Sequence, residues 1–242
     1  MSSFRVLCVE NAKTVKGEAL GYLTGILYLA PSDASGIANV CPNASPGCRA
    51  ACLYSAGRAA LDPAIPAARI ARTKRFFADR LNFLDDVARD IAAIVRKAKR
   101  DGLKPAIRLN GTSDLPWERI RMRDNRTLLE AFPRVRFYDY TKVPKRMDAF
   151  VKGHMPHNYS LTFSHSETNG TEALAVLANG GNVAVVFFTK KRDALPATFQ
   201  GARVIDADAH DLRFLDPRGV VCGLRAKGDA KHDTSGFVQI GA

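Results

Sequence analysis

Six short apolar runs, about twenty to thirty residues apart, constrain the fold of this chain more than any other feature. Segments long enough for helices separate the first four runs, over 123–131, 146–151 and 171–178. A strand, a crossover and a further strand are typical of a parallel sheet, and crossovers of this length favour a barrel over a meander. The runs lie at 106–109, 135–138, 160–163, 183–188, 202–205 and 220–224. The sequence therefore predicts an α/β fold with a partial parallel (β/α) barrel.

Upstream of these runs, apolar residues recur at alternating steps of four and three from Phe77 to Val95. This spacing predicts an amphipathic helix that starts after Pro66 and ends near Asp101. The first 65 residues have a weaker pattern, with short strands and turns around 22–29. Because no repeat, low-complexity tract or Gly/Ser linker interrupts the chain, we expect one domain over 1–242. It would consist of an irregular N-terminal region, 1–65, and a barrel-like part, 66–242.

The charge balance points to a polyanionic partner. The chain has 242 residues, 46% hydrophobic and 25% charged, which excludes disorder for most of its length, and its formal charge is +12. The stretch 69–104 carries half of that excess. We therefore expect nucleic acid to bind in a basic groove. The residues expected to hold it are Arg69, Arg72, Lys74 and Arg75. A basic surface that serves only solubility is the alternative. No apolar window is long enough to cross a bilayer and the N-terminal residues show no signal-peptide pattern, so we expect a cytoplasmic protein without a membrane partner.

Three of the five cysteines fall within twelve residues, which indicates a ligand role. Cys41, Cys48 and Cys52 are spaced C-x6-C-x3-C among turn-forming prolines and a glycine. Zinc normally binds tighter C-x2-C pairs, whereas three loop thiolates suit three irons of a 4Fe-4S cluster. Cys222 is the candidate fourth ligand, and a buried, small apolar role for it is the alternative. The scattered histidines have no metal-ligand spacing.

Polar residues follow the predicted strands, at the edge where parallel sheets collect their function. Lysines and arginines there can grip phosphate or carboxylate groups by charge-assisted hydrogen bonds. The candidate ligand-binding residues are Asn110, Ser113, Lys142, Glu167, Lys190, Arg192 and Arg225. Ordinary loop polarity is the alternative for any one of them. No catalytic residue is assigned.

Three patches carry a resemblance to a known family: residues 45–54 with S-P-G-C-x-x-x-C-L-Y, residues 137–147 with Y-T-K-V-P-K-R, and residues 161–169. Together they resemble the phage gene-product-88-like domain family over roughly residues 40 to 170. More distantly they resemble radical S-adenosylmethionine enzymes of the spore photoproduct lyase type. The resemblance implies a 4Fe-4S cluster near the mouth of a partial barrel, and the cytoplasm of a host cell as the location.

Three functions remain open. The first is an iron-sulfur phage protein that binds DNA or RNA. The second is a radical enzyme that acts on a nucleic acid or nucleotide with S-adenosylmethionine as its cofactor, although the cysteine spacing differs from the C-x3-C-x2-C of those enzymes. In that reading, Asn110 to Asp114 take the place of a glycine-rich cofactor-binding stretch. A structural zinc site is the third, and the oligomeric state stays open.

Overall fold

The computed structural model describes residues 6–10, 12–52, 54, 58–190 and 193–240. Its centre is a parallel sheet in the order β2, β3, β4, β5, β6, β9, β8, with short antiparallel strands β1 and β7 at the two edges. The strands are β1 (Leu7–Cys8), β2 (Tyr22–Leu27), β3 (Lys104–Arg108), β4 (Arg136–Thr141), β5 (Tyr159–Ser164), β6 (Val183–Phe187), β7 (Thr198–Phe199), β8 (Ala202–Asp206), β9 (Val221–Arg225) and β10 (Val238–Gln239). β10 pairs with the second half of β6. The prediction of an α/β protein with a mostly parallel sheet is confirmed.

The sheet is open. Within the described residues, its path runs from β1 to β7 without returning on itself. The order also departs from a simple succession of neighbours, because β9 pairs with both β6 and β8 and so separates them. The sheet therefore does not form the barrel expected from the crossover lengths. The crossovers make the strands parallel, but they do not bring the two edge strands of the sheet together.

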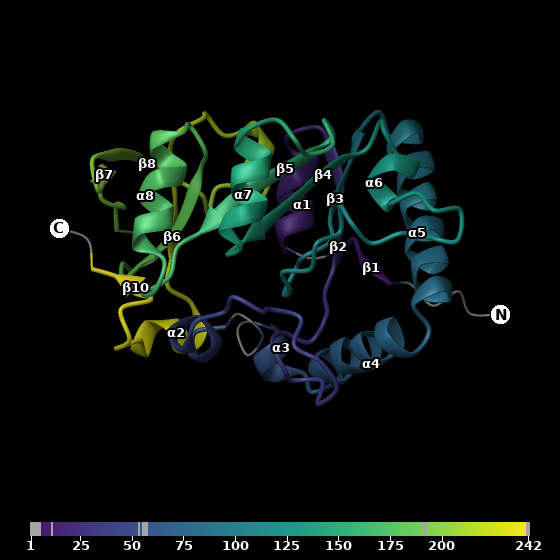
Figure 1. Cartoon of the computed structure of the whole chain (residues 1–242), viewed down its shortest axis with the longest axis horizontal. Coiled ribbons are helices and arrows are strands. Elements are labelled where there is room, and N and C mark those ends of the chain that lie inside the picture. Colours follow the sequence, from purple (N-terminus) through teal and green to yellow (C-terminus); the bar gives the residue numbers. More distant parts are fainter. Residues whose placement is uncertain (1–5, 11, 53, 55–57, 191–192, 241–242) are drawn as a thin grey trace.

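The helices are α1 (Ala12–Glu18), α2 (Pro46–Ala50), α3 (Arg58–Leu61), α4 (Ala64–Ala78), α5 (Arg80–Arg100), α6 (Leu128–Ala131), α7 (Pro144–Val151) and α8 (Gly170–Ala178). Helices α5 to α8 pack on one face of the sheet, whereas α1 lies on the other face, where Gly17 approaches Leu212. Side chains from α5 to α8 form the main core with inward residues of the strands, such as Ile107 and Phe137. The neighbouring residues Ala106 and Tyr138 point to the other face, as strand alternation requires, and pack there against Leu212. Figure 1 shows α7 and α8 on one side of the strands.

The long predicted helix is two helices. α4 ends at Ala78 and α5 begins at Arg80, with Asp79 between them in a non-helical conformation (φ −142°, ψ 61°). Phe76 and Phe83 meet across this break, with ring centroids 5.5 Å apart. The apolar spacing misses the break because residues on both sides of it face the same core. In Figure 1 the two helices meet at a steep angle.

The segment between β2 and α4 lies against the carboxyl end of the sheet. Its backbone is tied to the loop after β3, since Asp114 donates from its amide to the carbonyl of Val40 at 2.8 Å. In Figure 1, α2, α3 and α4 lie along one end of the strands. This packing brings the cysteine-containing loop next to the polar residues that follow β3, β4 and β5. None of the helices in the described ranges has both the length and the apolar character needed to cross a membrane.

Candidate functional site

A carboxylate from the sheet holds the cysteine loop in place. Ser45 caps α2, accepting from the Cys48 amide at 3.2 Å and donating from its hydroxyl to Glu167 at 2.7 Å. The other oxygen of Glu167 accepts from the Gly47 amide, also at 2.7 Å. A Cβ on Gly47 would lie 2.0 Å from the Ser235 hydroxyl and 2.8 Å from Glu167, so only glycine fits. Glu167 therefore fixes the backbone that carries Cys48.

The three loop thiols share one neighbourhood. Burial raises the pKa of Cys41 to about 12, and the charges of Cys52 and Cys48 raise it further, while a backbone hydrogen bond from Ser32 opposes them. Burial also raises the pKa of the Cys52 thiol, and here Tyr54 supplies the opposing backbone hydrogen bond. The Cys41 thiol lies 3.7 Å from the carbonyl of Thr112, in the loop after β3. The sulfurs are thus within electrostatic reach of one another at the sheet edge.

Two buried cations, Arg69 and Lys142, act on the Cys52 thiol. Arg69, on α4, lies over the rings of Tyr28 and Tyr54, at 5.0 and 5.5 Å from their centroids. Its positive charge and that of Lys142 both lower the pKa of Cys52, against the larger effect of burial. Neighbouring cations favour the thiolate form of a cysteine, which is the form that binds metals.

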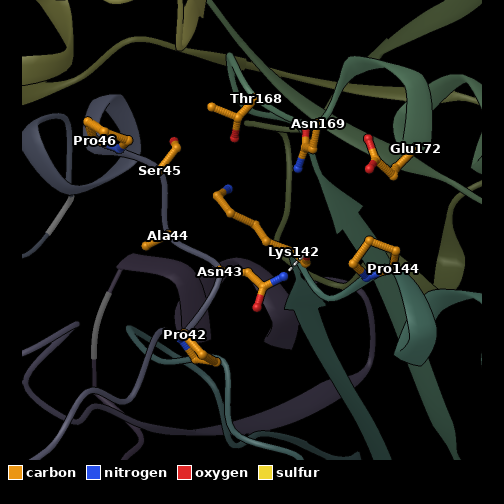
Figure 2. Close-up of a pocket in the computed structure, with 10 residues that line it drawn as sticks. All are labelled: Pro42, Asn43, Ala44, Ser45, Pro46, Lys142, Pro144, Thr168, Asn169 and Glu172. Atoms are coloured by element: carbon orange, nitrogen blue, oxygen red, sulfur yellow. Dashed lines mark hydrogen bonds between the residues drawn. The ribbon is translucent and has the colours of Figure 1, made fainter.

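Lys142 is a buried ammonium whose partners are neutral. It is 9% exposed, and its Nζ donates to the Ser164 hydroxyl at 2.5 Å and lies 5.4 Å from the ring centroid of Phe237. No carboxylate among the described residues lies within 4 Å of it. The side chain crosses a cavity of about 410 Å³ between the cysteine loop and the start of α8 (Figure 2). Asn43, Thr168 and Glu172 also line this cavity.

Behind the cavity lies a buried polar network that fixes the backbone of Lys142. The Lys142 amide donates to Asp114 at 2.8 Å, and Arg146 donates to Asp114 at 2.6 Å and to Glu118 at 2.9 Å. Arg146 also donates to the Tyr159 hydroxyl, which donates in turn to Asp139. Burial raises the pKa of Asp139 to about 7, opposed by hydrogen bonds from the Asn110 amide and Tyr159.

Comparison with protein families decides the relationship of the chain. The family model described as Gene product 88 matches residues 5–240. The chain belongs to the gene product 88 family. This confirms the phage family that residues 45–54, 137–147 and 161–169 indicate. Searches of curated proteins and of solved structures find no match.

In this gene product 88 family member, Cys222 lies apart from the loop cysteines. It is buried on β9, packs with Ala184 and Val220, and its thiol donates to Asp216 at 3.4 Å. Burial raises its pKa to about 12, with the charge of Asp216 as the next cause. Within the described ranges, no group of three or more His, Cys, Asp or Glu side chains is arranged to hold a metal ion.

The other predicted ligand-binding residues do not all meet. Asn110 is buried, and its side-chain oxygen accepts from Ser113 and from the Trp117 indole, so both polar residues brace the loop after β3. Arg225, on β9, forms an ion pair with Asp206 at 2.9 Å. Lys190 is exposed after β6, and Arg192 lies outside the described residues. Lys142 and Glu167 alone among the described candidates take part in the cysteine site or its cavity.

The four predicted nucleic-acid-binding residues are in different surroundings. Arg69 is buried, and Arg72 is half-buried with its guanidinium on the Tyr28 carbonyl at 3.3 Å. Arg75 forms an ion pair with Asp86. Lys74 is exposed. The structure does not gather these four into one exposed surface, because two of them face the protein interior.

Sequence reasoning missed Arg146 and Asp139, which position the site. A charged residue in the middle of the apolar run of β4 was the available signal for Asp139, since a central strand carries a buried charge only where partners exist. The sequence gives no such indication for Arg146, because it looks like the exposed arginines near it in the chain. Only the folded structure shows that Asp114 and Glu118 lie next to it.

Proposed function

We propose that this protein holds a 4Fe-4S cluster on Cys41, Cys48 and Cys52 and binds nucleic acid through its basic surface. The observation that carries the first half is three neighbouring, half-buried thiols at the carboxyl edge of a parallel sheet, with the positive charge of Arg69 acting on Cys52. Function collects at that edge in open α/β sheets.

The surroundings of the thiols fit such a cluster chemically. Three thiolates and their sulfide-bridged irons carry net negative charge, which the buried guanidinium of Arg69 would partly offset. Hydrogen bonds to the sulfurs tune a cluster, and the backbone of Ser32 and Tyr54 supplies two of them. We expect the three thiols to draw closer together when they bind, since metal coordination deprotonates Cys41 and Cys52 despite their raised pKa values.

Anaerobic purification followed by iron and acid-labile sulfide quantitation tests the cluster. The wild-type protein should be brown, and Cys41→Ser, Cys48→Ser and Cys52→Ser should each lose most of the iron. Cys222→Ser is the matched control, because its thiol bonds to Asp216 and not to the loop, and it should keep the wild-type iron content. A colourless wild-type protein containing zinc would overturn the proposal in favour of a structural zinc site.

The net charge of +12 supports nucleic acid as the partner. Exposed cations without ion pairs lie on α4 and α5, including Lys74, Arg96 and Lys99. In a fluorescence-polarisation titration, the double variant Arg96→Gln, Lys99→Gln should lower the slope of log affinity against log salt by about 0.9 for each lost phosphate contact. Lys231→Gln, on the far 3-10 turn Gly228–His232, is the control. Affinity that does not change with salt would contradict the proposal.

A specific observation also favours radical chemistry as a second function. Because Cys222 bonds to Asp216, a cluster on the three loop thiols would keep one iron free of a protein thiolate from β9. Such an open iron is what S-adenosylmethionine chelates in radical enzymes. Incubation of the reduced protein with S-adenosylmethionine under strict anaerobiosis should then release deoxyadenosine. If none is formed by brown, reduced protein, this second function fails while the cluster proposal stands.

A further inference from the structure

The cavity around Lys142 has the properties of a binding site for a small phosphorylated ligand. We propose that it binds the phosphate group of a free mononucleotide, with the Lys142 ammonium as its counter-ion. This inference goes beyond the cluster and does not require it, since it rests on Lys142 and the cavity.

The Lys142 ammonium has no carboxylate partner among the residues that the structure describes. A buried ammonium is costly unless a counter-charge or several hydrogen bonds compensate it. Lys142 is 9% exposed, yet its contacts are the Ser164 hydroxyl, two backbone carbonyls at 3.4–3.5 Å and the Phe237 ring. All of these are neutral. An anion bound in the cavity would supply the missing charge.

Two further hydrogen-bond donors, Asn43 and Thr168, line the cavity with the Lys142 ammonium. Figure 2 shows the Lys142 side chain running into the cavity, with Asn43 below it and Thr168 above it. Asn43 presents an amide nitrogen, at present 3.5 Å from the Lys142 carbonyl, and Thr168 presents a hydroxyl. A phosphate has three acceptor oxygens, which match an ammonium, an amide and a hydroxyl better than a carboxylate with two oxygens does.

The start of α8 adds to this donor set. Its N-cap residue, Asn169, makes no side-chain cap, because its amide is used on Ser164 and its oxygen on the Ser166 backbone. Asn169 and Glu172 bring the start of α8 to the cavity wall, and the positive end of this nine-residue helix favours an anion there.

The size of the cavity favours a free nucleotide over a longer chain. A volume of about 410 Å³ lies in the range of small-molecule sites, about 300–1,000 Å³. One carboxylate, Glu172, lines it from the exposed side of α8. Its negative charge would weaken phosphate binding. Removing that charge in Glu172→Gln should therefore strengthen binding, the opposite of the effect of Lys142→Met.

Isothermal titration calorimetry of the full chain tests the proposal with adenosine monophosphate, inorganic phosphate and adenosine. Adenosine monophosphate should bind, inorganic phosphate should compete with it, and adenosine should not bind. Lys142→Met should weaken binding at least about thirtyfold, because a buried charged partner is lost. Glu172→Gln should tighten it about two- to fivefold. Lys145→Met, an exposed lysine on α7, is the control and should leave the affinity unchanged.

The thermal midpoint of the same variants separates a ligand role from a structural one. If Lys142 serves only the fold, Lys142→Met should lower the midpoint; if it serves a ligand, the unliganded variant should be at least as stable as wild type and should lose the stabilisation by adenosine monophosphate. Absence of binding at millimolar nucleotide, or equal binding by Lys142→Met, would overturn the proposal. Binding of a phosphorylated oligonucleotide without binding of the mononucleotide would overturn the assignment to a free nucleotide. Iron content measured on the same samples shows separately whether the cluster is present, so a failure of nucleotide binding is not confused with the absence of a cluster.

Discussion

Replacing Arg146 by methionine removes the cation that holds two buried carboxylates together. The Arg146 side chain is 4% exposed and donates to Asp114 at 2.6 Å and to both oxygens of Glu118 at 2.9 Å. Methionine keeps an apolar stem in the same space but offers no donor. The side chain of Glu118 is 6% exposed and would lose its counter-ion, while Asp114 would keep the Lys142 amide.

The expected loss in the free energy of unfolding depends on the different partners left to Asp114 and Glu118. Removing one partner of a buried ion pair destabilises a protein by about 3–5 kcal/mol. Because Asp114 retains a backbone donor and Glu118 does not, we expect about 4 kcal/mol near neutral pH. Burial already raises the pKa of Asp114 while Arg146 lowers it, so the variant would raise it further. A carboxyl whose pKa is raised in the folded state lowers the free energy of unfolding as the pH rises from its unfolded-state pKa to its folded-state pKa, so the deficit should be larger at high pH than at low pH.

Urea unfolding followed by circular dichroism, at about pH 5 and about pH 8, measures both effects. Arg126→Met is the matched control, because Arg126 pairs with Asp124 at 2.7 Å but the two side chains are 59% and 45% exposed. Such a pair contributes little, so the control should match wild type at both pH values. A loss below about 1 kcal/mol for Arg146→Met, or the same loss at both pH values, would refute the reasoning.

Three further predictions concern the same edge of the sheet. Burial raises the pKa of Asp139 from 3.8 to about 7. The free energy of unfolding of the wild type should therefore fall relative to that of Asp139→Asn as the pH rises between these two values. Urea titrations that show a constant difference across this range would contradict the prediction. Gly47→Ala should lower iron retention, since its Cβ would strike Ser235 and Glu167, whereas Gly170→Ala, with open space at its Cβ, should retain iron like wild type. Glu167→Gln leaves one acceptor for two donors and should cost about 1–2 kcal/mol in urea unfolding, with faster hydrogen exchange at the Cys48 amide; unchanged exchange would show that Glu167 does not hold the loop.

The sequence predicted the strands well because their apolar runs are short and bounded. The run 183–188 became β6, Val183–Phe187, and the run 220–224 became β9, Val221–Arg225. The order of the strands was harder, because it depends on contacts distant in sequence. One signal was available: the first four residues of β9 are apolar or glycine and three of them are buried, which suits an interior strand, while β8 has Arg203 at its second position and no buried residue, which suits a strand near the edge.

The cysteine spacing predicted converging thiols, and in the structure Cys41, Cys48 and Cys52 lie within electrostatic reach of one another, but among the described residues they are not arranged as a metal site. The charge count could not separate exposed cations from internal ones. Arg69 stacks on two tyrosines and Arg75 pairs with Asp86, and both look like surface residues in an amphipathic pattern. The long stems of arginine allow such burial, which only tertiary contacts reveal.

Native mass spectrometry of the anaerobically purified protein tests the central claim most directly. The account predicts an intact species heavier than the polypeptide by the mass of four irons and four sulfides, which disappears in the Cys41→Ser, Cys48→Ser, Cys52→Ser triple variant and persists in Cys222→Ser. A wild-type protein with the bare polypeptide mass, or a cluster that survives the triple variant, would contradict it.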